Sequence, residues 1–164
     1  MSITATTPEF FIERMRLDAE SIPWDKRASY LEHNRALCLA QFSIPAVRMT
    51  AVQVDPTDAE RAEWKHGATH YRCHFTCNGK RMSVPYHMGL AHKNPPTMWK
   101  VLSCLFSDAD SAGESFESWA SDMGMDTDSR KAEKTYKACQ SIAKRLDALF
   151  GSNLEVWREL SRDV

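Results

Sequence analysis

The stretch from His70 to Tyr86, HYRCHFTCNGKRMSVPY, decides the fold of this chain. Asn78-Gly79 in its middle is the strongest short signal for a β-hairpin, because a type I′ turn needs a positive φ at both central residues. This turn pairs Cys77 with Lys80, and the alternation along both arms then puts the apolar side chains on one face. The polar side chains of the other face are Arg72, His74, Arg81 and Ser83. A slip of one residue would turn the apolar set outward, so the sequence predicts a single register.

The segments around the hairpin predict the rest of the fold. Residues 47–54 are rich in β-branched side chains and read as a third strand, while residues 8–17 and 25–41 read as helices. Apolar residues recur at helical spacing in most of 97–150, interrupted by a polar break at 108–113. We therefore expect an α+β fold: a small three-stranded antiparallel sheet packed on a C-terminal helical layer, with N-terminal helices.

The chain length predicts a single domain over residues 1–164. Within it, we expect a helical N-terminal extension over residues 1–45, the antiparallel sheet over 46–93 and the helical part over 94–164. We find no internal repeat and no inter-domain linker.

Composition and charge narrow the classes of function. The formal net charge of the 164 residues is −1, which argues against a bulk electrostatic attraction to nucleic acid or to an anionic membrane. No apolar run approaches the roughly 20 residues that span a bilayer, and the N-terminus does not read as a secretory signal. The five cysteines are scattered singly and do not predict a disulfide framework. We expect a cytoplasmic protein with no membrane contact.

Six histidines and cysteines lie in or just after the hairpin, and these residue types are the usual ligands of a zinc site. Cys73 and Cys77 share a face but lie about 13 Å apart along an extended strand, too far to bind one ion. His70 and His74 point to the opposite face. We therefore expect no metal site, with core cysteines and solvent-facing histidines instead. The six residues are His70, Cys73, His74, Cys77, His87 and His92.

Other motifs of catalysis and cofactor binding do not occur in the sequence. There is no glycine-rich phosphate loop, no H-E-x-x-H motif and no nucleophile elbow. The run from Asp108 to Gly113 resembles the start of an EF-hand calcium loop, but its twelfth position holds Trp119 instead of the bidentate Glu. We therefore expect a protein that is not an enzyme and has no cofactor.

Much of the second half of the chain resembles a group of small proteins encoded in bacteriophage and prophage genomes. The resemblance covers Val84 to Gly151, through VPYHMGLAH, WKVLSCLFSDA, SFESWASDMGMDTDSRKAEKTYKACQSIAKRL and LFG. It implies a phage origin, and with it a location in the cytoplasm of the host cell, and it carries over no catalytic residue. Small phage proteins without catalytic motifs often act by binding, and this predicts a non-enzymatic inhibitor of a host defence system, such as an anti-CRISPR protein. Such an inhibitor would bind an effector complex and block nucleic-acid access or nuclease recruitment.

This hypothesis assigns partner-binding roles to two kinds of residue. Acidic side chains can dock on the basic nucleic-acid channel of a host protein or ribonucleoprotein complex. We expect Asp108, Asp110, Glu114 and Glu117 to do so. The aromatic residues Trp24, Trp64 and Trp99 lie outside the clearest core positions, so they could anchor a partner, form a homodimer contact or cover the sheet edges. Of these three, we assign Trp24 to the partner.

The alternative function is an accessory DNA-binding protein of phage replication or recombination. It would contact single-stranded or duplex DNA through the basic face of the hairpin, formed by Arg72, His74, Lys80 and Arg81.

Overall fold

The computed structural model describes residues 3–163, which group into two compact units. One unit contains the chain up to Ala46 and from Phe150 onward, and the other contains Val47 to Leu149. Helices and an antiparallel sheet make this an α+β protein, which confirms the predicted fold class. The predicted single domain stays a prediction.

The sheet has the order β1 (Arg48–Val54), β2 (Thr69–Cys77), β3 (Lys80–Met88), and both pairings are antiparallel. Cys77 pairs with Lys80 across the hairpin, as predicted. Asn78 and Gly79 have φ values of 49° and 79°, which is the left-handed conformation that a type I′ turn requires at both positions.

The face of the sheet that the hairpin register predicts to be apolar is the buried one, and we call it the inner face. The side chains of Tyr71, Cys73, Phe75, Met82 and Val84 are all buried, and they alternate with partly or fully exposed neighbours along most of both strands. Phe75 and Cys73 are completely inaccessible to solvent. This face therefore forms half of a core that another layer must complete.

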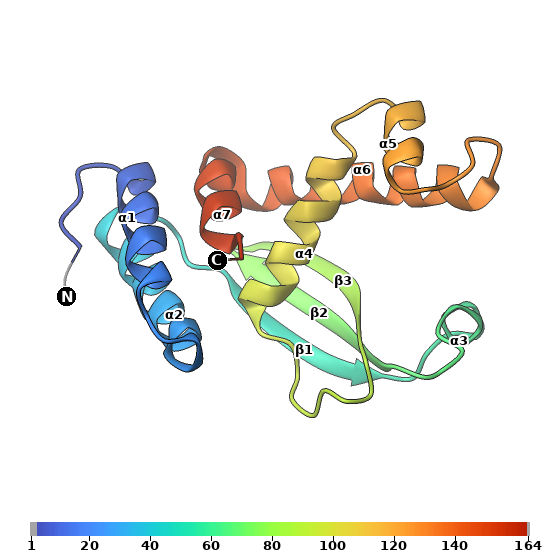
Figure 1. The fold of residues 1–164 in the computed structure, drawn as a ribbon, viewed down its shortest axis with the longest axis horizontal. Coiled ribbons are helices and arrows are strands. Elements are labelled where there is room, and N and C mark those ends of the chain that lie inside the picture. The colour runs from blue at the N-terminus through green and yellow to red at the C-terminus, as the bar shows by residue number, and fades with distance from the viewer. Residues whose placement is uncertain (1–2, 164) are drawn as a thin grey trace. The chain divides into compact units, whose positions relative to one another are not determined.

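Helices of the C-terminal part supply that layer. Helix α4 (Met98–Ser111) begins after Thr97, whose hydroxyl accepts a hydrogen bond from the Lys100 N–H, and it crosses the sheet (Figure 1). Helix α6 (Arg130–Phe150) runs alongside β3, where Arg145 donates a hydrogen bond to the Ser83 carbonyl. The buried α4 residues are Val101, Leu102, Leu105, Phe106 and Ala109.

The polar break expected over residues 108–113 is wrong for residues 108–111, because α4 continues to Ser111. Ala109 extends the buried stripe of the helix by one more turn, and its burial outweighs the polar character of its neighbours. The chain leaves the helix only at Ala112-Gly113. Helix α5 (Phe116–Asp122) then starts after Ser115, whose hydroxyl accepts a hydrogen bond from the Ser118 N–H.

The connection between β1 and β2 contains a short helix, α3 (Asp58–Glu63), beyond one end of the sheet (Figure 1). A capping box forms its N-terminus: the Thr57 hydroxyl accepts the Glu60 N–H, and the Glu60 carboxylate accepts the Thr57 N–H. None of its residues is buried, so α3 has little packing of its own to hold it in place.

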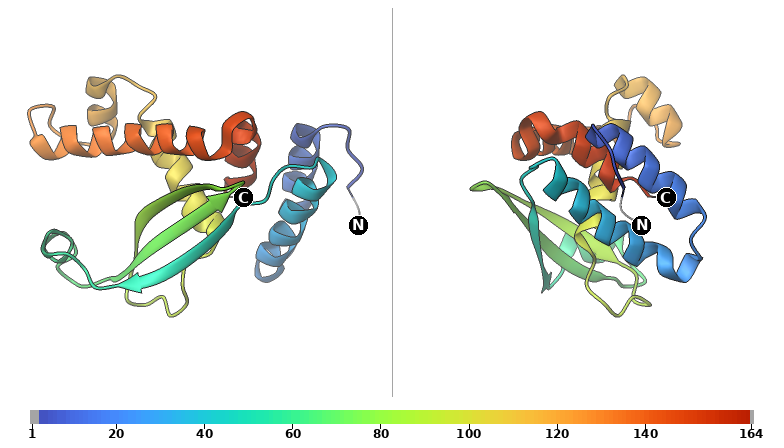
Figure 2. Two further views of the ribbon diagram at one scale, coloured as in Figure 1. Left: turned by 180° about the vertical axis from the view of Figure 1, so that it is seen from behind. Right: turned by 90° about the vertical axis from the view of Figure 1, so that its left-hand side faces the viewer.

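The other unit is helical, with α1 (Pro8–Glu20), α2 (Trp24–Gln41), a 3₁₀ turn η1 (Gly151–Asn153) and α7 (Leu154–Ser161) (Figure 2). Its core includes Trp157, which stacks on Phe150 with ring centroids 5.0 Å apart. The buried Arg35 guanidinium donates from Nε to the Leu160 carbonyl at 2.8 Å, near the end of α7. This bond satisfies a carbonyl that the end of a helix leaves without an internal partner.

Candidate functional site

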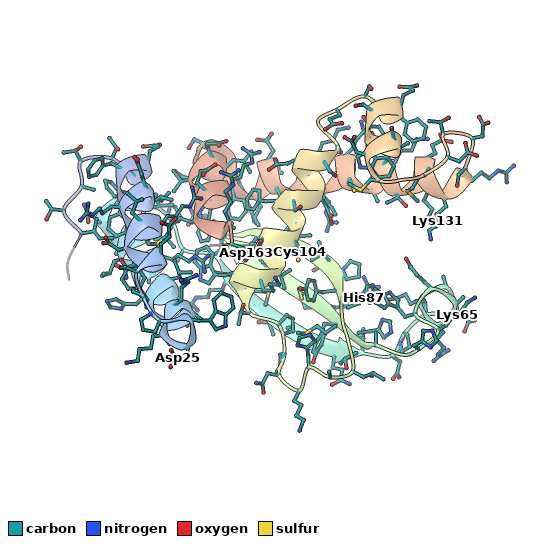
Figure 3. All side chains as sticks on the ribbon, viewed as in Figure 1. Asp25, Lys65, His87, Cys104, Lys131 and Asp163 are labelled. Carbon is teal, nitrogen blue, oxygen red and sulfur yellow. The ribbon has the colours of Figure 1, made fainter. Side chains whose placement is uncertain are left out.

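Three side chains from separate segments meet on the outer face of the sheet, at the end where α3 lies. His70 of β2 and His87 of β3 face each other with their Nδ1 atoms 2.7 Å apart. Oε2 of Glu60, on α3, lies 3.2 Å from Nδ1 of His70 and 3.5 Å from Nδ1 of His87. We call these three residues the histidine cluster; Figure 3 labels His87 in this region. The three atoms are placed so that one metal ion could touch all of them.

Local sequence explains how the two histidines come together and which oxygen of Glu60 is available to them. The hairpin register makes His70 the direct cross-strand partner of His87, so both rings lie on the same face. The capping box uses Oε1 of Glu60 to accept the Thr57 N–H at 3.2 Å, and this leaves Oε2 directed toward the histidines.

Burial and hydrogen bonding set the charge states in the histidine cluster. The bond from the Thr57 N–H lowers the pKa of the Glu60 carboxyl, and His70 and His87 act in the same direction. Burial, followed by repulsion from His70, lowers the pKa of His87 from its ordinary value of 6.5. At neutral pH the cluster therefore contains a carboxylate and a neutral His87 ring, which has one nitrogen lone pair to offer.

The predicted acidic residues lie within one stretch of the second unit. Asp108 and Asp110 belong to the last turn of α4, Glu114 lies in the following loop and Glu117 in the first turn of α5. All four are exposed, and three further exposed carboxylates follow in the sequence. We call residues 108–128 the acidic segment. Its carboxylates are Asp108, Asp110, Glu114, Glu117, Asp122, Asp126 and Asp128.

Aromatic packing holds the acidic segment on the first half of α6. Trp119 is buried between Phe116 and Tyr136, with the Trp119 and Tyr136 rings 5.3 Å apart. The Tyr136 hydroxyl donates to the Glu114 carbonyl at 2.6 Å, and the Trp119 indole donates to the Ser111 hydroxyl at 3.3 Å. The segment thus has an apolar inner side and a carboxylate-rich outer side.

Three of the predicted basic residues, Arg72, His74 and Arg81, lie on the outer face of the sheet. The prediction is wrong for Lys80, because it pairs with the buried Cys77 and so shares the face of that residue. His74 pairs across the strands with Ser83, and its Nδ1 lies 2.7 Å from the Ser83 hydroxyl. Arg72 is partly exposed and Arg81 is exposed. Arg48 of β1 pairs with Thr76 of β2, which in turn pairs with Arg81 of β3. Arg48 therefore lies on the same face and is a third arginine there, one that was not predicted from the sequence.

Trp24 lies at the start of α2, in the helical unit, and its side chain is 80% exposed. The Arg27 guanidinium lies 5.5 Å from the centre of its ring, at a distance typical of a cation–π contact. Such exposure is unusual for tryptophan, so the residue has more surface to offer a partner than any other large apolar side chain described here.

Glu60 is the member of the histidine cluster that was not predicted from the sequence. His70 and His87 were among the candidate zinc ligands, but the distance between ligands was considered only along one strand. Two signals were readable: the Thr57-x-x-Glu60 capping pattern, and the extension of the hairpin register to His70 and His87. The one relation that no local signal supplies is the approach of α3 to the sheet.

Comparison with known proteins adds no identification, because no family model, curated protein or solved structure matches the chain. Within residues 3–163, no helix has the length and apolar character needed to cross a membrane.

Proposed function

We propose that this chain is a phage-encoded, non-enzymatic inhibitor of a host defence system, which binds an effector complex and blocks its access to nucleic acid, as an anti-CRISPR protein does. The observation that carries the proposal is the acidic segment. It has seven exposed carboxylates, and no lysine or arginine occurs between Lys100 and Arg130.

Charge complementarity is the physical argument. A channel that holds nucleic acid is lined with lysine and arginine side chains that contact phosphates. A surface with spaced carboxylates presents the same sign of charge as a phosphate backbone, so it is attracted to such a channel. Because the whole chain has a net charge of only −1, its negative charge is concentrated locally in this segment.

The packing of the acidic segment also favours binding. The Trp119 cluster and the bond from Tyr136 to the Glu114 carbonyl fix the backbone that carries the carboxylates. A surface that is ordered before it meets its partner loses less conformational entropy on binding.

Trp24 is the second point at which we propose that the chain contacts its partner. Exposed tryptophans are typical anchors of protein–protein interfaces because burial of the indole ring removes a large apolar area from water. Trp24 lies outside the part of the chain that resembles phage proteins, residues 84–151, so it suits a role in selecting one particular host partner.

A plaque assay tests this function. Phage carrying or lacking the gene are plated on hosts with active CRISPR systems of different types. We expect the gene to restore plaques on at least one type. Failure to restore plaques on any of the types would overturn the proposal.

A pair of charge variants tests the role of the acidic segment. One variant neutralises four of its carboxylates, and the control neutralises four exposed carboxylates elsewhere, so that both change the net charge equally. Loss of protection in the first variant alone supports the docking surface, and equal loss in both contradicts it. The test variant carries D108N, D110N, E114Q and E117Q, and the control carries E13Q, E20Q, E32Q and D147N.

One observation favours a second function, that of an accessory DNA-binding protein. Arg48, Arg72 and Arg81 share the outer face of the sheet with His74. Arginines on a sheet face can contact phosphates, and binding would then weaken steeply as salt displaces the protein. A gel-shift titration in low salt decides this: no shift of single-stranded or duplex DNA at excess protein eliminates the second function, and a shift lost in R72A/R81A supports it.

A further inference from the structure

We propose that the histidine cluster binds one zinc ion through Nδ1 of His70, Nδ1 of His87 and a carboxylate oxygen of Glu60. This inference is independent of the proposed inhibitor function, because it rests on a different part of the molecule.

With both rings neutral and no cation, a single Nδ1–H of His70 has to serve both hydrogen bonds of the cluster. Nδ1 of a neutral imidazole either donates or accepts, and a carboxylate only accepts. If Nδ1–H of His70 donates to both neighbours, the lone pairs of His87 and Glu60 still face each other at 3.5 Å. If both rings carry a proton on Nδ1, two N–H groups collide at 2.7 Å. A cation among the three atoms removes both conflicts.

The spacing of the three atoms suits zinc. Tetrahedral ligands about 2.0–2.1 Å from a zinc ion lie about 3.3 Å from one another. The observed separations of 2.7, 3.2 and 3.5 Å lie on both sides of this value, so small side-chain rotations suffice to reach it.

The surroundings of the cluster hold the ligands in place. The His70 side chain is only 4% exposed, and the Trp64 ring packs against the His87 ring with centroids 5.5 Å apart. The Thr57 N–H holds the other oxygen of the Glu60 carboxylate. Such contacts outside the ligand shell orient metal ligands and raise affinity.

The donor set selects the class of ion. Two imidazole nitrogens and one carboxylate oxygen suit zinc and other first-row transition metals such as Fe(II), whereas calcium and magnesium prefer oxygen ligands alone. Cys73 and Cys77 face the core on the other side of the sheet, so no thiolate joins the set. Three protein ligands leave a fourth position for water.

The ion would fasten α3 to the sheet. Helix α3 has six residues, none of them buried, which is too short and too exposed to be stable by itself. Glu60 is the α3 residue that reaches His70, ten positions further along the chain. Zinc bound to both would close the β1–β2 connection over the end of the sheet.

Zinc titration of the full chain tests the site. The protein is treated with a chelator, dialysed, and titrated with zinc chloride in a calorimeter, and its thermal unfolding is recorded with and without zinc. We expect one zinc per chain and a Tm rise of about 5–10 °C at zinc near 100 times the Kd.

The variant E60Q tests the assignment without removing the capping box, because glutamine serves at that capping position as well as glutamate does. E60Q and H87A are each expected to bind zinc at least about tenfold more weakly. H74A, which removes an exposed histidine of the same sheet face, is expected to bind as the wild type does.

Two results would overturn the proposal. One is the absence of both heat and Tm shift in excess zinc, while circular dichroism shows a folded chain. The other is zinc binding that E60Q and H87A leave unchanged, or that only neutralisation of the acidic segment removes, since the ion would then lie elsewhere.

Discussion

His70 lies directly opposite His87 across the β2–β3 ladder, and their Nδ1 atoms are 2.7 Å apart. The pairing follows from the turn at Asn78-Gly79, because counting outward from the Cys77–Lys80 pair along both arms leads to these two residues. A contact at the far end of the sheet is therefore determined by the geometry of a two-residue turn.

The orientation of the sheet faces predicts opposite outcomes for two neighbouring residues. F75D should abolish cooperative unfolding, because Phe75 is completely buried and an aspartate there would have no partner for its charge. H74D, on the exposed face, should leave the Tm nearly unchanged. Circular dichroism with thermal melting measures both, and similar tolerance of the two changes would contradict the register.

The hairpin turn predicts a local cost at Gly79. Its φ is 79°, and a Cβ added there would meet no heavy atom within 4 Å, so G79A tests backbone strain alone. We expect G79A to lower the free energy of unfolding by about 1 kcal/mol, because alanine disfavours the left-handed conformation. N78G is the matched control and should change stability less. Urea denaturation measures both, and a neutral G79A would argue against the turn type.

Thiol reactivity should distinguish Cys104 from the other four cysteines. Cys104 is the one that is not buried, and it lines a cavity of about 520 Å³ beside Tyr86. Burial raises the pKa of Cys38 and Cys73 to about 11, so both stay protonated and unreactive at neutral pH. An Ellman titration of the native protein should find one fast thiol, which C104S removes. Several fast thiols would contradict the core packing.

Trp24 should contribute to binding and not to stability. W24A is expected to leave the Tm unchanged, whereas W157A should lower the free energy of unfolding by about 3–5 kcal/mol, because Trp157 is buried on Phe150. Thermal and urea unfolding compare the two variants.

Light scattering separates the two uses of the exposed Trp24 ring. We expect the mass of a single chain, with W24A reducing protection in the plaque assay. A doubled mass that W24A returns to a single chain would instead assign Trp24 to the predicted homodimer contact.

In the acidic segment, the sequence predicted the secondary structure of two carboxylates incorrectly. Asp108 and Asp110 were predicted to lie in a loop, because their polar character interrupts the apolar pattern. They belong to α4 because Ala109 between them is buried against the core. A single small apolar residue is a weak signal in the sequence, and only its tertiary surroundings make it decisive.

The sequence by itself determined the hairpin, its register and the caps at Thr57, Thr97 and Ser115, because each depends on hydrogen bonds and dihedral preferences within a few residues. Only the tertiary structure decided that Glu60 meets His70 and His87. That meeting depends on how the β1–β2 connection folds back onto the sheet, which no periodicity of the chain encodes. Local interactions are readable along the chain, whereas a site assembled from three segments depends on the path of the connections between them.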